Sequence, residues 1–457
     1  MGNRRPFRSA VAALAALLAT SFAPPTAAQQ QISIIRDAEV ENIIRAYAAP
    51  VFRAGGFDSR AIKIHLVLDR SLNAFVALGL NMFFHTGLLV RADDPSQVIG
   101  VMAHELGHIT GGHLARMEER MRQAQNQSIA TFLLAGAAAI LTGRGDAAMA
   151  VLSGGQQATI ASLLQYSQTQ ESAADQAGLR FLDDASVSAR GLGEFLRVLE
   201  NQELLAVGRQ DPYMRTHPVT RSRIDAVEAH VARSPFSNTP TPPAFIEMHK
   251  RMRAKLFAFT EPPVTALAAT LQRYPESDTS VPARYARAIA YYRKPDLPKA
   301  LDLIDGLIAD EPKNPYFHEL RGQMLFENGR AADGVGSLDT AVALLPDSPP
   351  IRTLYGQVLI ELGDSASNKL AILQLEQARK LEDDYIAPFR LLAIAYGREG
   401  QIGMAALSQA EFALGTGRNS EAKAQADKAM KELRQGTPQW LRAQDIRQQA
   451  ENRQKAG

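Results

Sequence analysis

The sequence contains no cysteine. This excludes a disulfide framework, a thiolate nucleophile and a cysteine-ligated zinc or iron–sulfur site. Any metal ion that the protein binds must therefore be held by histidine and carboxylate side chains. An excess of charge is missing as well, because 50 Lys and Arg residues stand against 48 Asp and Glu residues. Binding to nucleic acid needs a clustered basic excess to neutralise phosphates, so this balance argues against a nucleic-acid partner.

The first 28 residues show the three-part pattern of a secretory signal peptide. A basic start precedes an apolar, alanine-rich run at residues 11–23, and small residues at 26–28 suit a signal peptidase. The apolar run is too short to span a bilayer comfortably, and no cysteine follows it that could carry a lipid anchor. We expect general secretion rather than twin-arginine export, and a mature periplasmic protein that begins near Gln29.

The remaining chain divides into two parts of different character. Eight of the nine histidines lie between His65 and His249. The stretch at residues 234–244 is rich in proline, serine and threonine, which is typical of a linker. We therefore expect one domain at residues 29–233, which holds most of the histidines, and a second domain at residues 245–457.

The second part contains a sequence repeat. Gly322 and Gly356 are 34 residues apart, as are Pro312 and Pro346, and an insertion around residues 364–369 shifts the unit that follows. A period of 34 residues with a small residue in the first helix is the tetratricopeptide pattern. One helix pair cannot bury its apolar face alone, so stacked pairs are expected to form an α-solenoid with a concave binding surface. The alternative is a generic helical bundle.

The first part is expected to be mainly helical with a small sheet. Residues 62–68 have the alternation of a strand, and residues 73–76 and 82–84, on either side of a glycine, indicate a β-hairpin. Asp94-Pro95 is typical of a helix start. The predicted helix runs through the sequence H-E-L-G-H at residues 104–108.

Two histidines four residues apart project from the same face of a helix, so His104 and His108 can bind one ion. Glu105 lies beside them and can take the proton of a water that a zinc ion acidifies, which is how a metallopeptidase attacks a peptide bond. A catalytic zinc needs a third protein ligand. Glu171 and Asp175, four residues apart on a second predicted helix, could supply that ligand and a hydrogen bond to a ligand histidine. The alternative for this pair is a solvated helix face.

These motifs together resemble the M48 family of zinc metallopeptidases. The resemblance rests on these segments: His104-Glu105-x-x-His108, Glu171-x-x-Ala174-Asp175, Thr216-His217-Pro218 with Arg223-Ile224, and Asn73-Ala74-Phe75 ahead of Thr86-Gly87-Leu88-Leu89. It implies a gluzincin-type fold with one zinc ion per chain held by His104, His108 and Glu171. It also implies that Glu105 is the general base and that Asp175 orients a ligand histidine.

Two further residues have alternative roles. The resemblance implies that His217 lies near the zinc, where it either stabilises the oxyanion or occupies the fourth ligand position and keeps the enzyme latent. A histidine before a proline is otherwise most often a loop or capping residue. Arg223 either stabilises the oxyanion or braces the site by a salt bridge. Asn73, Ala74 and Phe75 are expected to form a strand whose edge pairs with an extended peptide, with an ordinary hairpin strand as the alternative.

Three other histidines and one apolar segment are interpreted as parts of the fold and not of the metal site. His65, His85 and His113 are not expected to be ligands. His113 follows His108 by five residues, off the ligand face, and its neighbours Gly111 and Gly112 loosen the helix. The apolar segment at residues 128–164 is expected to be a helical hairpin packed under the site. The alternative is that its apolar faces contact the membrane surface or a partner.

The leading hypothesis is a periplasmic zinc endopeptidase that degrades misfolded or stalled outer-membrane proteins. The resemblance, extended by the signal peptide and the repeats, implies that the repeat domain contacts these clients or the β-barrel assembly machinery. The rival hypothesis is an assembly chaperone or scaffold for outer-membrane β-barrel proteins, whose zinc site is structural or held shut. Retention of Glu105 favours the enzyme, because a purely structural metal site needs no general base.

Overall fold

The computed structural model describes residues 33–125, 167–203 and 217–456, apart from positions 59, 78, 118, 121 and 124. The predicted signal peptide at residues 1–28 and the predicted helical hairpin at residues 128–164 lie outside the described residues. Among the described helices, none combines the length and the hydropathy needed to cross a membrane.

The predicted fold class, mainly helical with one small sheet, is confirmed. Within the described ranges the sheet has four strands in the order β1, β2, β4, β3. Their bounds are Ile34–Ile35 for β1, Lys63–Val67 for β2, Ala74–Ala77 for β3 and Asn81–His85 for β4. β4 is parallel to β2 and antiparallel to β3, so the predicted hairpin is present and β3 lies at one edge of the sheet.

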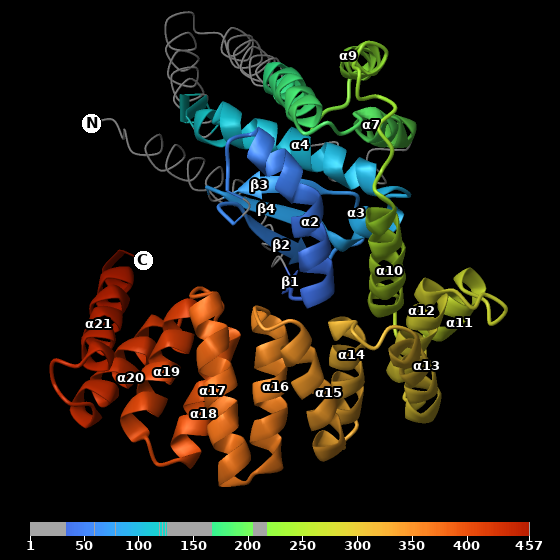
Figure 1. Ribbon diagram of the computed structural model, residues 1–457. Coiled ribbons are helices and arrows are strands. Elements are labelled where there is room, and N and C mark those ends of the chain that lie inside the picture. The colour runs from blue at the N-terminus through green and yellow to red at the C-terminus, as the bar shows by residue number, and fades with distance from the viewer. Residues whose placement is uncertain are drawn as a thin grey trace, which may run out of the picture. The chain divides into compact units, whose positions relative to one another are not determined.

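Two helices pack against this sheet (Figure 1). α2, Ala38–Ala54, contacts β2, and α4, Pro95–Gly111, contacts β3; the two helices also contact each other. Their apolar side chains form one core with the inward-facing side chains of the strands, such as Leu66, Met82 and Phe84, each of which is almost fully buried. The core therefore fixes α4, which carries the predicted metal ligands, against the edge half of the sheet.

Helix α4 has well-defined ends. The side chain of Asp94 accepts a hydrogen bond from the backbone N–H of Ser96 at 2.8 Å, and Pro95 occupies the first turn, where a backbone N–H needs no intrahelical partner. The helix ends at Gly111 because Gly112 adopts a left-handed conformation with a φ of +62°. This end determines where the next histidine lies.

Glycines allow two other helices to lie directly on α4. A Cβ atom at Gly107 would be 2.5 Å from the carbonyl oxygen of Ala174, in the helix at residues 167–184. A Cβ atom at Gly100 would be 2.7 Å from the backbone nitrogen of Leu192, in α7. The remaining bounds in this part are Thr86–Arg91 for α3, Arg190–Glu203 for α7 and Arg221–Val231 for α9.

The helix after the predicted linker belongs to both parts of the fold. α10, Pro243–Thr260, buries Met252 and Leu256 in the core around the sheet. Its Ala254 and Ala258 are buried in the core of the helices that follow. The two parts consequently share a helix as well as a connection.

The second part consists of helices that pack on their neighbours in chain order, as predicted for an α-solenoid (Figure 1). Their bounds are Ala266–Arg273 (α11), Val281–Arg293 (α12), Leu297–Asp310 (α13), Pro315–Glu327 (α14), Ala331–Leu344 (α15), Pro349–Leu362 (α16), Ser365–Leu381 (α17), Ala387–Arg398 (α18), Ile402–Gly415 (α19), Asn419–Glu432 (α20) and Pro438–Ala456 (α21).

The glycines that define the repeat are the points where paired helices touch. A Cβ atom at Gly322 in α14 would be 2.5 Å from the side chain of Leu338 in α15, and one at Gly356 in α16 would be 2.6 Å from that of Leu375 in α17. α17 has 17 residues, whereas α13 and α15 have 14 each. The extra length begins at Ser365, which is where the sequence indicated an insertion.

Candidate active site

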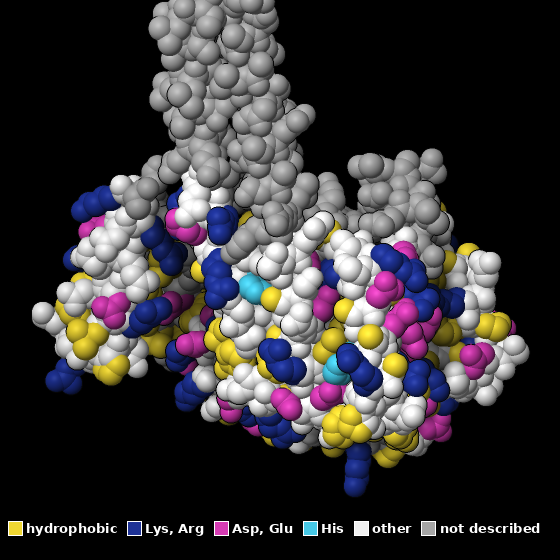
Figure 2. Space-filling view, turned by 90° about the horizontal axis from the view of Figure 1, so that it is seen from above, with side chains coloured by type: hydrophobic (Ala, Val, Ile, Leu, Met, Phe, Trp, Pro, Cys, Tyr) yellow, Lys and Arg dark blue, Asp and Glu magenta, His cyan; other side chains and the backbone are white. Residues whose placement is uncertain are grey.

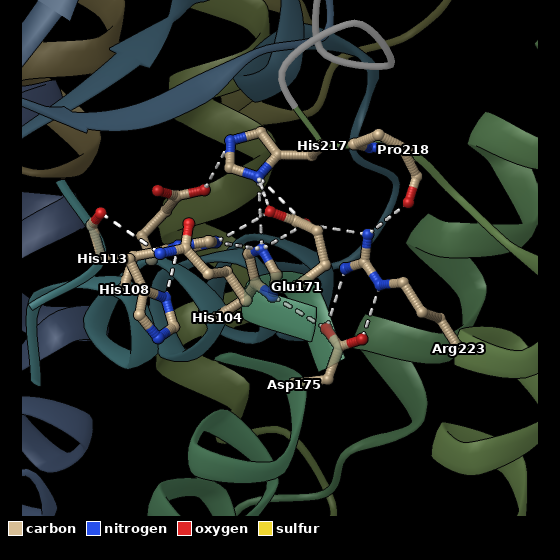
Figure 3. A network of polar contacts seen from close by, with 10 residues as sticks. His104, His108, His113, Glu171, Asp175, His217, Pro218 and Arg223 are labelled. Atoms are coloured by element: carbon tan, nitrogen blue, oxygen red, sulfur yellow. Dashed lines mark hydrogen bonds and ion pairs between the residues drawn. The ribbon is translucent and has the colours of Figure 1, made fainter. Parts of the chain in front are cut away.

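Four buried side chains that could hold one metal ion come together from three segments of the chain. His104 and His108 project from α4, Glu171 comes from the helix at residues 167–184, and His217 lies just before α9. One ligand atom from each lies within 4.8 Å of all the others (Figure 3). The fold therefore places the three ligands expected from the sequence side by side, with His217 as a fourth member.

The spacing of these atoms suits a single small ion. His108 Nε2 lies 3.1 Å from His104 Nε2 and 3.3 Å from Glu171 Oε1, and His104 Nε2 lies 3.4 Å from Glu171 Oε2. His217 Nδ1 lies 3.4 Å from His104 Nε2 and 3.2 Å from each carboxylate oxygen of Glu171. Four ligands arranged tetrahedrally at zinc bond lengths would be roughly 3.3 Å apart. The residues thus fit a zinc ion, with His217 in the fourth position.

A buried Asp–Arg pair supports these ligands. His104 Nδ1 donates a hydrogen bond to Asp175 at 2.8 Å, which directs Nε2 toward the other ligand atoms. Arg223 donates to both oxygens of Asp175, at 2.6 and 2.9 Å. Its Nη1 lies 2.9 Å from Glu171 and donates to the carbonyl oxygen of Pro218 at 2.8 Å. Two roles were considered for Arg223, stabilisation of an oxyanion and a salt bridge that braces the site. These contacts are those of the salt bridge.

Burial and neighbouring charge set the protonation of the cluster. Burial lowers the pKa of His104, but hydrogen bonds to two carboxylates outweigh it and raise this pKa to about 10, so a metal ion that binds Nε2 must replace a proton there. Burial lowers the pKa of His108 to about 3. For Glu171 and Asp175, burial favours the protonated form, yet the histidine and arginine groups that face them lower both pKa values, that of Asp175 to about 2. Both carboxylates are therefore ionised and suited to a cation.

Glu105 lies beside the ligand group without belonging to it. It is fully buried, and neither carboxylate oxygen has a hydrogen-bond partner among the described residues. Its Oε1 lies 3.6 Å from His217 Nε2. Burial raises the pKa of Glu105. A buried carboxyl group that lies next to a metal site and has no hydrogen-bond partner is suited to exchanging a proton with a reacting molecule.

His113 also joins this cluster, which the sequence interpretation did not foresee. Its Nδ1 lies 3.0 Å from Nδ1 of His108, and the side chain is only 5% exposed (Figure 3). The interpretation placed His113 off the ligand face, because it follows His108 by five residues, and noted only that Gly111 and Gly112 loosen the helix there. The helix ends at Gly111 instead, and the turn at Gly112 brings the imidazole of His113 back to His108. The pair Gly111-Gly112 was the sequence signal for this turn.

The predicted substrate strand lies on the sheet beside the motif helix. Asn73 directly precedes β3, whereas Ala74 and Phe75 are within it, and β3 contacts α4. The ring of Phe75 stacks on Phe83 at 4.8 Å. His65 stacks on the same phenylalanine at 4.7 Å and does not belong to the ligand group.

Residues 35–231 match the model of peptidase family M48, and this range contains every member of the ligand group. The β-barrel assembly-enhancing protease of Yersinia pestis is 25% identical over 290 residues, which are 63% of this chain and 58% of that protein. The protein of the same name from Escherichia coli K12 is 24% identical over 294 residues, 60% of this chain and 56% of that protein.

The chain thus spans a little over half the length of these two relatives. A crystal structure of MamA is similar over 37% of this chain and 95% of its own length, with a TM-score of 0.28 and 16% identity.

Proposed function

Because residues 35–231 of this chain are a peptidase family M48 domain, we propose that the protein is a zinc-dependent endopeptidase. The observation that carries the proposal is the buried Glu105, whose two carboxylate oxygens have no hydrogen-bond partner among the described residues, beside the group of four ligand atoms. A structural metal site has no use for such a carboxyl group, because its four ligands complete the coordination.

His104, His108 and Glu171 would hold the ion, as a His₂Glu set typical of catalytic zinc. When bound, zinc would polarise the scissile carbonyl group and lower the pKa of a water molecule. Glu105 accepts the proton of the attacking water at one of its unpaired oxygens and passes it to the leaving amine. Its raised pKa suits both halves of this exchange, since the group must take up the proton and hold it until the amine leaves.

His217 is proposed to keep the site latent. Its Nδ1 lies 3.4 Å from His104 Nε2 and 3.2 Å from Glu171 Oε1, and we propose that it fills the fourth ligand position, which a reacting water would need. Cleavage therefore requires His217 to leave that position. Arg223 is proposed to position Asp175 and Glu171 rather than to bind an oxyanion, because its guanidinium group already faces both carboxylates.

The edge strand β3 is the proposed binding site for the substrate backbone. An extended peptide that pairs with residues 74–77 would gain main-chain hydrogen bonds that do not depend on its sequence. The strand contacts α4, so such a peptide would run beside the helix that carries His104 and Glu105. This mode of binding suits unfolded polypeptides, whose backbone groups are accessible.

The proposed clients are misfolded or stalled outer-membrane proteins in the periplasm. Two relatives named β-barrel assembly-enhancing protease support this client class. The α-solenoid would bind the client or the β-barrel assembly machinery, as stacked helical repeats commonly bind proteins. On the face in Figure 2, which is seen from the top of Figure 1 and not from the side of the solenoid, basic and acidic side chains are interspersed.

A chaperone or scaffold for β-barrel assembly is the second candidate. The observation in its favour is the complete set of four protein ligands, because a site closed by His217 does no chemistry until that residue moves. The two candidates differ in whether the peptidase ever opens.

Cleavage of an unfolded outer-membrane protein by the purified, zinc-loaded protein tests the proposal. Wild type should cleave it, and Glu105→Gln should lower the rate at least about 100-fold while zinc stays bound. Glu247→Gln, the same change at an exposed pair with Lys250, is the matched control and should cleave as wild type does. No cleavage by any of the three, with zinc bound, would favour the scaffold.

A further inference from the structure

We propose that His113 is a positioning residue for the metal ligand His108: its Nδ1 accepts a hydrogen bond from Nδ1–H of His108. This inference rests on the proposed function, because it assumes that His108 Nε2 binds the ion. It adds to the site a residue that does not belong to the group of ligands.

The geometry points to a hydrogen bond between the two rings. The two Nδ1 atoms are 3.0 Å apart, and the ring centroids are 4.9 Å apart with an interplanar angle of 81°. Both side chains are buried, His108 at 8% and His113 at 5% exposure. A polar group buried to this degree is normally hydrogen-bonded, and each Nδ1 has the other as its partner.

The direction of the bond follows from the other nitrogen of His108. Its Nε2 faces His104 and Glu171 at 3.1 and 3.3 Å, so Nε2 must keep its lone pair to bind an ion. A neutral imidazole with a free Nε2 carries its proton on Nδ1. His108 is then the donor, and His113 must present an unprotonated Nδ1 and carry its own proton on Nε2.

The chain around His113 is built to hold this ring in place. Gly112, in the left-handed region at φ +62°, turns the backbone at the end of α4. A Cβ atom at Gly111 would lie 2.3 Å from His113 Nε2, so only glycine leaves room for the returning imidazole. The backbone carbonyl of His113 accepts a hydrogen bond from Gln170, the residue next to Glu171, at 3.4 Å.

Each histidine of the motif therefore has its own partner. His104 donates its Nδ1 proton to the carboxylate of Asp175, and His108 donates its Nδ1 proton to a neutral imidazole. Such partners fix the tautomer and the ring orientation of a ligand, and their removal typically weakens metal binding about 10- to 100-fold.

The test is the rate of zinc release to a chromogenic chelator, measured on the full chain. His113→Phe keeps the ring and removes the acceptor, and it should release zinc roughly 10- to 100-fold faster than wild type. His113→Asn places an amide oxygen near the position of Nδ1, and it should release zinc almost as slowly as wild type. His249→Phe is the matched control, because it removes another buried histidine, bonded to the carbonyl of Ala92 at 2.8 Å, and should leave zinc release unchanged.

A second readout reports the tautomer itself. In ¹⁵N-histidine spectra of the zinc-loaded protein, the signal lost in His113→Asn should belong to a neutral imidazole protonated on Nε2. Protonation of His113 on Nδ1 would overturn the inference. A His113→Phe protein that releases zinc as slowly as wild type would overturn it too. So would a His113→Asn protein that releases zinc as fast as His113→Phe. Failure of the wild-type protein to bind zinc would instead overturn the proposed function, and this inference with it.

Discussion

Substitution of Gly107 by alanine should disable the metal site more than it destabilises the fold. Gly107 lies on α4 between Glu105 and His108 and faces the helix at residues 167–184. An added Cβ atom would lie 2.5 Å from the carbonyl oxygen and 2.8 Å from the Cα atom of Ala174. These are backbone atoms, so no side-chain rotation can relieve the contact.

The size of the effect follows from these distances. Ordinary contacts begin near 3.4 Å, so the two helices must separate by about 0.9 Å at this point. Ala174 is three residues from Glu171, which would move away from the histidines, and metal–ligand distances tolerate only about 0.2 Å. We expect zinc affinity to fall at least about 100-fold, with a loss of roughly 1–3 kcal/mol in the free energy of unfolding.

Two other glycines make the experiment a graded one. A Cβ atom at Gly178 would lie 3.0 Å from the backbone of Ala103 at the same helix contact, so Gly178→Ala should weaken zinc binding less than Gly107→Ala does. Gly336 in α15 has no atom within 4 Å of an added Cβ. Gly336→Ala should therefore leave zinc binding unchanged and raise stability by about 0.5–1 kcal/mol.

Zinc affinity would be measured by competition with a chelator, and folding by circular dichroism and by the fluorescence of Trp440, the single tryptophan, which lies in α21. A Gly107→Ala protein that binds zinc within about threefold of wild type would refute the argument that this backbone contact sets the ligand spacing. Equal zinc loss in Gly336→Ala would refute it too, because that change touches nothing near the site.

Three further predictions concern other parts of the molecule. His217→Ala should retain zinc through the remaining three ligands and cleave an unfolded substrate at least about 10-fold faster, and a slower rate with zinc bound would contradict the latent role. Phe317→Ala, which empties a fully buried position whose ring centroid is 5.0 Å from that of Tyr285, should lower the free energy of urea unfolding by about 3–5 kcal/mol, and a loss below about 1 kcal/mol would contradict the packing. Burial raises the pKa of Glu319 from 4.5 to about 8, against the opposing effect of Lys255. As the pH rises from 4.5 to 8, Glu319 then ionises in the unfolded chain but stays protonated in the folded one, so its contribution to the free energy of unfolding falls over this window. Glu319→Gln should therefore be more stable than wild type by on the order of 2 kcal/mol at pH 9 but not below pH 4.5. Parallel stability–pH curves for the two proteins would contradict this.

Features that depend on local spacing were predictable from the sequence. Two histidines four residues apart must share a helix face whatever surrounds the helix, so the pairing of His104 and His108 needed only the correct assignment of α4. The start of that helix was equally local, because Asp94 caps it and Pro95 fits its first turn. The repeat was visible because helix pairs of constant length bring a small residue such as Gly322 to the same contact in each unit.

Features that depend on the path of the chain did not follow from spacing, and the family resemblance was needed to place His217 near His104. The spacing of His113 placed it off the ligand face only if the helix continued, and one left-handed glycine reverses that conclusion. The partners of Arg223 come from a helix almost 50 residues earlier, and no periodicity links them. The double role of α10 depends on which core each of its faces meets, which the apolar pattern of a single helix leaves open.

The contacts of Arg223 also limit how the site can open. Its Nη1 holds the carbonyl oxygen of Pro218 at 2.8 Å and lies 2.9 Å from Glu171, so the residue after His217 is tied to a ligand of the proposed zinc ion. The same guanidinium group keeps Asp175 bonded to His104. Release of His217 by breaking the Arg223 contacts would therefore disturb the zinc ligands as well. If His217 keeps the site latent as proposed, the fourth position can open without that damage when the imidazole of His217 rotates away while Pro218 stays bound to Arg223.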